Sequence, residues 1–191
     1  MNTKTLAAII VFTALTVALN PAVSGIGIPA FYAPFLIYGL WEIPIVAAFI
    51  LISPAVGILI SILNAVVLFG FFPGALPTGP FYNLIAIFSM LLGVYVGRRF
   101  FAFEPTKGQN VIKIAAASTI LGIVLRVAVM TVVNYFTLPQ GYPIGFGLNE
   151  LAVLTVYLPP IALFNATVVL YTVPLGEFIS DIVKSRTRFK T

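Results

Sequence analysis

The chain has 191 residues, of which 61% are hydrophobic and 8% charged, with a net charge of +5 and a mean hydropathy of +1.13. Soluble domains contain roughly 45–50% apolar residues, so this composition excludes a water-soluble protein and is typical of an integral membrane protein. The sequence contains no cysteine or histidine and no Walker, dinucleotide-binding or zinc-protease motif. We therefore expect no enzyme, no catalytic residues, no metal site and no cofactor.

Six apolar segments are long enough to cross a bilayer as helices, because about 20 residues span roughly 30 Å of hydrocarbon. The first segment lacks an A-x-A-like cleavage site, so we expect a retained helix rather than a signal peptide. The sequence predicts an all-α fold, with one membrane domain over residues 1–191. The predicted transmembrane helices are 5–21, 34–52, 54–72, 80–98, 111–135 and 151–178.

The basic residues predict the orientation of these helices. Apart from Arg126, they fall before the first span, between the fourth and fifth, and after the sixth, as Lys4, Arg98, Arg99, Lys107, Lys113, Lys184, Arg186, Arg188 and Lys190. With six spans these places share one side of the membrane, which the positive-inside rule assigns to the cytoplasm. Both termini are predicted to be cytoplasmic, and the basic charge requires no nucleic-acid partner.

The connections predicted on the outer side contain no lysine or arginine and are dense in glycine, proline and aromatic residues. They are residues 20–33, 72–79 and 136–150. Such sequences either fold back as a lid of turns or form an aromatic belt at the membrane interface. Both interpretations remain open from the sequence.

The first two spans carry one packing signal and one acidic residue. Ala14 and Ala18 are small residues four positions apart, which lets another helix approach closely. Glu42 lies near the outer part of the second span. It either pairs with Arg126 inside the bundle or is solvated at the outer rim, and its position favours the rim.

Polar residues in the last three spans predict a binding pocket. Arg126, Met130 and Asn134 are spaced i, i+4, i+8, so they share one helix face over about 12 Å. A buried arginine costs on the order of 3 kcal/mol unless it is paired or meets a watery cavity, which makes it a functional candidate. The alternative is that Arg126 snorkels or bonds helix carbonyls.

Two further asparagine side chains lie at depths in the predicted bundle that are comparable to that of Asn134. Asn83 follows Phe81 and Tyr82 at the outer start of the fourth span, where it either faces a ligand or serves a turn. Asn165 follows a Pro-Pro step that distorts the sixth span. Three amides, an arginine and several aromatic residues are typical of a pocket for a flat, heteroatom-rich small molecule.

The motifs together resemble the substrate-binding S components of energy-coupling factor (ECF) vitamin transporters, most closely the riboflavin branch. The fifth-span sequence from Arg126 to Phe136 matches R-x-x-x-M-x-x-x-N-[YV]-[FL], and Gly79 to Ala86 matches G-x-x-x-N-[FL]-x-A. Weaker matches are the Ala14/Ala18 pair, Ile43-Pro44 with residues 53–57, and Phe164-Asn165-Ala166 after Leu158-Pro159. Val168 stands where some members have a lysine.

The resemblance implies a high-affinity vitamin-binding subunit in the plasma membrane. It would take riboflavin from outside, then associate with a transmembrane coupling subunit and two cytoplasmic ATPases. Asn134 and Asn165 would hold the polar edges of the isoalloxazine ring, assisted by Asn83. Aromatic residues near Tyr82 and Tyr135 would cover its faces.

The resemblance also implies that Arg126 organises the pocket from below, while Ala14 and Ala18 contact the coupling subunit. An S component for a thiamine- or pyridoxine-type vitamin is the alternative within this class. A stand-alone secondary carrier is the alternative outside it, although a proton-driven carrier would be expected to hold a membrane-embedded acid.

Overall fold

A computed structural model describes residues 3–72, 76–101 and 109–186 of the chain. The long helices are α1 (Thr3–Leu19), α3 (Glu42–Leu51), α4 (Pro54–Phe71), α5 (Gly79–Phe101), α6 (Gln109–Thr137) and α8 (Leu158–Arg186). Shorter elements are α2 (Pro21–Ser24), β1 (Ile28–Ala30), β2 (Ala33–Tyr38), α7 (Glu150–Ala152) and the π-helical turn η1 (Val153–Tyr157). Residues 73–75 of the predicted outer connection, and Lys107, Arg188 and Lys190, lie outside the described ranges.

The mostly helical fold predicted from the sequence is confirmed. Four helical stretches are long and apolar enough to cross a membrane: Pro54–Phe71, Gly79–Phe100, Ile112–Thr137 and Glu150–Arg186. The apolar helices α1, with 17 residues, and α3, with 10, are shorter. The count of six spans therefore stays a prediction.

The prediction of one continuous helix over residues 34–52 is wrong for its first part. Residues 33–38 form β2, which pairs antiparallel with β1 so that Ile28 lies opposite Tyr38 and Pro29 opposite Ile37. Aromatic and β-branched side chains favour a strand here, and prolines interrupt a helix in this stretch. The helix begins only at Glu42, and the all-α prediction needs this hairpin added.

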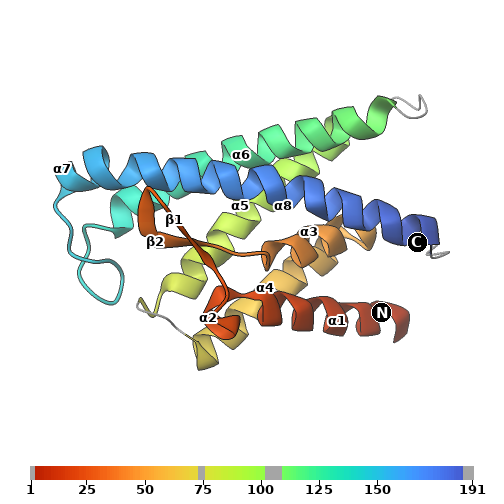
Figure 1. Cartoon of the computed structure of the whole chain (residues 1–191), viewed down its shortest axis with the longest axis horizontal. Helices are drawn as coiled ribbons and strands as arrows, with labels where there is room; N and C mark the ends of the chain where they lie inside the picture. The colour runs from red at the N-terminus through yellow and green to blue at the C-terminus, as the bar shows by residue number, and fades with distance from the viewer. Residues whose placement is uncertain (1–2, 73–75, 102–108, 187–191) are drawn as a thin grey trace.

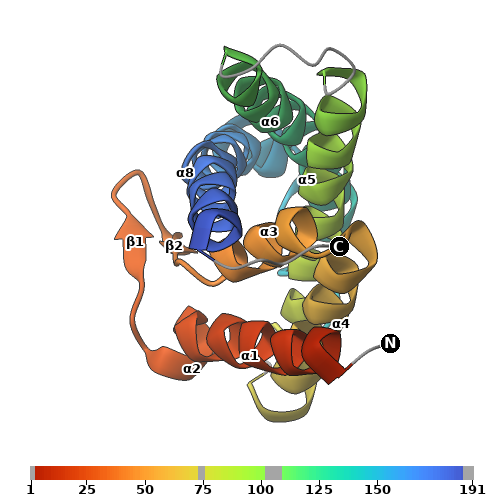
Figure 2. The same ribbon diagram turned by 90° about the vertical axis from the view of Figure 1, so that its right-hand side faces the viewer.

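Helix α3 forms the centre of the bundle. Nine of its 10 residues are buried, and it packs against α8, α4 and α1. Figure 2 shows α3 enclosed by α8, α5 and α4, with α1 below it in this view. The core around it includes Ile45, Val46, Ile60, Met90, Val94, Val169 and Val173.

Small residues allow the closest helix contacts. A Cβ atom at Gly97 of α5 would lie 2.7 Å from the Cα of Ser118 on α6, and one at Gly93 would collide with the backbone of Leu121. A Cβ atom at Gly176 of α8 would lie 2.6 Å from the side chain of Val46. These glycines therefore set the distances from α5 to α6 and from α8 to α3.

The bundle has two distinct ends. Figure 1 places both chain termini at one end, together with the last turn of α5 and the first turn of α6; we call this the terminal end. The hairpin β1–β2 and residues 138–149 lie toward the opposite end, the loop end. Residues 138–149 are tied down there, because Thr78 Oγ1 donates to Pro143 O at 2.7 Å and the Tyr82 hydroxyl donates to Ile144 O at 2.6 Å.

Candidate ligand-binding site

A buried charged network joins three helices near the middle of the bundle. Arg126 of α6 is only 4% exposed. Its Nη2 donates to Glu42 Oε1 at 2.9 Å, its Nη1 donates to Glu42 Oε2, and its Nε donates to Asn165 Oδ1 at 2.9 Å. The guanidinium therefore binds α3 through a bidentate ion pair and α8 through an amide, rather than snorkelling to an interface.

The prediction that Glu42 is solvated at the outer rim is wrong. Glu42 is 3% exposed and forms an ion pair with Arg126, which is the alternative that the sequence left open. The error follows from the hairpin: residues 33–38 leave the helical path, so Glu42 opens a buried helix instead of lying inside a long one. Its carboxylate is also favoured by the positive end of the α3 dipole.

A cavity of about 630 Å³, the main cavity, opens beside this network. Five of the predicted site residues line it: Tyr82, Asn83, Arg126, Asn134 and Asn165. Met130 lines it too, so the predicted common face of Arg126, Met130 and Asn134 is observed. The polar side chains from α5, α6 and α8 thus meet at one hollow.

Two predicted site residues point elsewhere. Phe81 is 50% exposed and Tyr135 is 38% exposed, and neither lines the main cavity. Each is the sequence neighbour of a lining residue, and consecutive helix positions differ by about 100° around the axis. Their rings therefore face away from the hollow that Tyr82 and Asn134 face.

The three amides differ in their free hydrogen-bonding capacity. Asn134 Nδ2 donates to Met130 O at 2.7 Å, and Asn165 Nδ2 donates to Ile161 O at 2.9 Å. Asn165 Oδ1 is occupied by Arg126. Among the described residues, Asn134 Oδ1 and the Asn83 amide form no hydrogen bond, so they are available to a ligand.

A second hollow, the side cavity, adjoins the main one. It measures about 370 Å³ and shares Phe35, Asn83, Arg126 and Phe164 with the main cavity. Glu42 lines it as well. Arg126 and Glu42 are the charged residues among those lining the two hollows, and they neutralise each other.

The hairpin supplies a wall that the sequence analysis missed. Phe35 of β2 lines both cavities and packs against Tyr157, with ring centroids 5.9 Å apart. Residues 33–38 are a short apolar run without a polar alternation, so the sequence offered no clear signal that separates a strand from a helix here. The first outer connection therefore folds as a structured cover against α8, as Figure 1 shows.

A chain of hydroxyl groups fastens the hairpin to α8. The hydroxyls of Tyr38 and Thr167 are 2.6 Å apart, and those of Tyr38 and Tyr32 are 2.5 Å apart. The Tyr38 ring also packs on Phe164, with centroids 4.7 Å apart. Burial and the hydrogen bond to Tyr38 raise the pKa of Tyr32, so its hydroxyl stays protonated at neutral pH.

The distortion predicted near the Pro-Pro step is a π-helical turn. Leu158 N–H bonds to Val153 O, five residues back, directly before Pro159 and Pro160. Neither proline has an N–H to continue the α-helical pattern. The wider turn ends at Tyr157, which lines the main cavity.

Ala14 and Ala18 are exposed on α1 and line neither the main cavity nor the side cavity. Helix α1 packs against α3 and α4 through its other side. The two small side chains therefore leave a surface without bulky groups, against which another helix can pack closely.

The arrangement described above is similar in fold to a solved transporter subunit. A solved structure of the S component of a bacterial ECF transporter matches with a TM-score of 0.75 and 20% sequence identity, covering 97% of this chain and 98% of that chain. No family model and no curated protein matches the sequence. The structural match spans nearly the whole of both chains and establishes the fold on which the site is built.

Proposed function

We propose that this chain is the substrate-binding subunit of an ECF importer and that its ligand is riboflavin. The observation that carries the proposal is the main cavity, where Asn83, Asn134 and Asn165 converge over the buried Arg126. Its volume of about 630 Å³ lies in the range of roughly 300–1,000 Å³ that small-molecule sites occupy. The S-component fold and the motifs in α5 and α6 support the same assignment.

The chemistry of the walls suits a flat, neutral ring system. Phe35, Tyr157 and Phe164 offer aromatic faces for stacking, and Asn83 and Asn134 offer amides for the ring's carbonyl and imide edge. Arg126 acts from below by holding Asn165 in place. Because Glu42 neutralises Arg126, the site favours neutral riboflavin over a cationic thiamine-type vitamin.

The proposed orientation follows from the two ends of the bundle. The termini and the basic residues Lys4, Arg98, Arg99 and Lys184 would face the cytoplasm, and the cavity would open toward the outside. In this arrangement β2 and α3 together would make the second of six crossings, in a multi-pass plasma-membrane protein. The single domain would cover residues 1–191.

The proposed partners are a transmembrane coupling subunit and two cytoplasmic ATPases. Ala14 and Ala18 would form the contact with the coupling subunit, since both are exposed and small. Among the described residues that line the two cavities, the one membrane-embedded acid, Glu42, is paired with a cation, so energy from ATP fits better than proton coupling.

The first test is to identify what the protein binds. Protein purified without added vitamin is expected to be yellow, with riboflavin found by absorbance and mass spectrometry. A colourless protein carrying a thiamine- or pyridoxine-type vitamin would move the assignment to another S component. Uptake by the chain alone in liposomes, without ATPases, would identify a secondary carrier.

The second test assigns the site. We expect Asn134→Leu to weaken riboflavin binding by about 1–3 kcal/mol, the cost of an unmade buried hydrogen bond. Tyr135→Leu is the matched control, because this neighbour is exposed and lines neither cavity. Asn165→Leu is expected to weaken binding as well, through the released Arg126. Unchanged affinity in both asparagine variants, measured by fluorescence titration, would contradict the site.

A further inference from the structure

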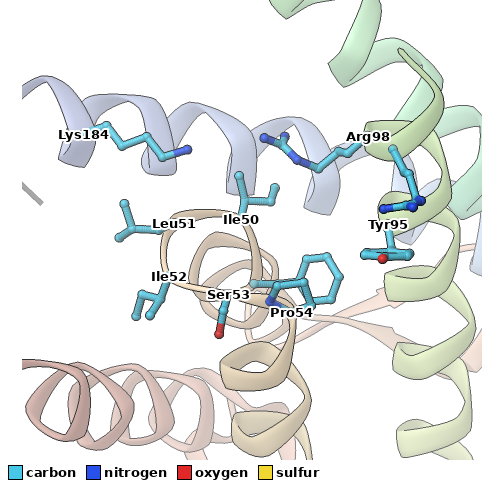
Figure 3. Close-up of a pocket in the computed structure, with 10 residues that line it drawn as sticks. Ile50, Leu51, Ile52, Ser53, Pro54, Tyr95, Arg98 and Lys184 are labelled. Atoms are coloured by element: carbon cyan, nitrogen blue, oxygen red, sulfur yellow. The ribbon is translucent and has the colours of Figure 1, made fainter. Parts of the chain in front are cut away.

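A second hollow, at the terminal end, has a different chemistry from the ligand site. It measures about 580 Å³ and lies between the last turns of α5, the α3–α4 turn and the last turns of α8. Arg98, Arg99 and Lys184 line it, together with Tyr95. Figure 3 shows Lys184 and Arg98 extending toward each other from opposite sides, above the turn from Ile50 to Pro54. We call it the basic hollow.

Only one of these three cations is neutralised. Glu177 accepts two hydrogen bonds from Arg98 Nη1, at 2.6 Å and 2.8 Å. Within the described parts of the chain, neither Arg99 nor Lys184 forms an ion pair, and the nearby Asp181 of α8 forms none either. Arg99 and Lys184 therefore line the hollow without a carboxylate partner among the described residues, and an anion bound between them would relieve their mutual repulsion.

The turn between α3 and α4, which forms one side of the hollow, adds little net charge. Helix α3 ends and α4 begins on either side of Ser53, so a negative and a positive helix end meet there. The two end charges offset each other. The positive charge of the hollow comes from its side chains, with Arg99 and Lys184 in the last turns of α5 and α8, where the helix dipole favours cations.

Apart from Ser53 and the Tyr95 hydroxyl, the remainder of the lining is apolar. Phe49, Ile50, Leu51, Ile52 and Pro54 form its floor, and the exposed Tyr95 stands at its edge. A free inorganic anion would use only the cations. A molecule with a phosphate head and a hydrocarbon chain would use both the cations and the floor.

We propose that the basic hollow binds the phosphate group of an anionic phospholipid from the cytoplasmic leaflet. Arg99 and Lys184 would donate charge-assisted hydrogen bonds to the phosphate, and an acyl chain would lie against Ile50 and Ile52. The inference rests on the membrane orientation in the proposed function. It goes beyond the positive-inside pattern, which needs cations near the surface but not around one hollow.

The test compares lipid binding by two charge-matched double variants of the full chain in detergent. Arg99→Gln/Lys184→Gln removes the free cations of the hollow. Lys4→Gln/Lys113→Gln removes two exposed cations at the same end that do not line it. Native mass spectrometry would measure retention of dioleoyl phosphatidylglycerol against dioleoyl phosphatidylcholine, with glycerol 3-phosphate as a soluble competitor.

We expect the parent and the Lys4/Lys113 variant to prefer phosphatidylglycerol, and the Arg99/Lys184 variant to bind it about tenfold more weakly, as the loss of charge-assisted contacts requires. The single variants Arg99→Gln and Lys184→Gln should each lose part of that affinity. They therefore still test the proposal if the double variant does not fold. Equal retention of both lipids by the parent, or equal losses in both double variants, would overturn the proposal. Displacement by equimolar glycerol 3-phosphate would assign the hollow to soluble phosphates instead.

Riboflavin titration of the same samples separates this inference from the proposed function. The basic hollow and the main cavity have no lining residue in common, so both double variants should bind riboflavin like the parent. Absence of riboflavin binding in all samples, with the lipid pattern intact, would reject the vitamin assignment and leave the lipid site standing.

Discussion

Replacing Glu42 by leucine would leave Arg126 charged, buried and without its carboxylate. The side chains of Arg126 and Glu42 are 5% and 4% exposed, so water cannot take over the lost contact without disturbing the bundle. Removing one partner of such a buried pair costs about 3–5 kcal/mol. At about 2–4 °C per kcal/mol for a chain of this size, the midpoint of thermal unfolding should fall by roughly 6–20 °C.

The double variant Glu42→Leu/Arg126→Met distinguishes charge from packing. Replacing both ions by apolar residues of similar size is often neutral, because no buried charge remains. We therefore expect the double variant to unfold well above either single variant and below the parent only by the cost of the lost bond to Asn165 Oδ1. The measurement is thermal unfolding of purified protein in detergent, with and without riboflavin.

Glu177→Gln serves as the control for this cycle. Its partner Arg98 has a side chain that is 33% exposed, so water can solvate the released guanidinium. Its loss should lower the midpoint less than the loss of Glu42. If the Glu42 and Arg126 single variants behave like this control, or if their effects simply add in the double variant, the buried ion pair is not what stabilises the three helices.

Three further expectations follow from the packing. Ala14→Leu/Ala18→Leu should reduce co-purification with the coupling subunit while riboflavin affinity stays constant; unchanged assembly would reject that interface. Gly93→Ala should lower the unfolding midpoint, because its Cβ would collide with α6, whereas Gly70→Ala meets open space and should not. Tyr38→Phe should speed riboflavin release in stopped-flow fluorescence, because the hairpin loses its hydroxyl bond to Thr167 of α8; an unchanged release rate would show that the hairpin does not gate the site.

Helices α6 and α8, and the polar face of α6, could be predicted from the sequence. Arg126, Met130 and Asn134 fall on one face because helix geometry alone fixes residues four apart, and no tertiary information is needed. The same rule, applied one residue further, separates Tyr135 from Asn134. The prediction of Tyr135 as a site residue was therefore inconsistent with helix geometry, because Tyr135 is rotated by about 100° from Asn134 around the helix axis.

The hairpin could not be predicted with the same rule. Residues 33–38 are apolar, and a short apolar run has no period that separates a buried helix from a strand. Its consequences were large, because the position of Glu42 depends on where the helix starts. Hydropathy predicts which segments of the chain are apolar. Whether a given residue is buried depends on the segments that pack against it, which hydropathy does not reveal.

The buried network and the cavity divide the polar residues into two groups. Arg126, Glu42 and Asn165 satisfy one another and tie α6, α3 and α8 together before any ligand arrives. Asn83 and Asn134 keep free groups in the main cavity. A ligand that bonded to these two amides would meet a floor whose charges are already paired, so it would gain hydrogen bonds without having to neutralise a buried ion. The geometry therefore separates the residues that hold the shape of the cavity from those that face its interior, and it explains how an ionisable residue can lie beneath the proposed pocket for a neutral molecule.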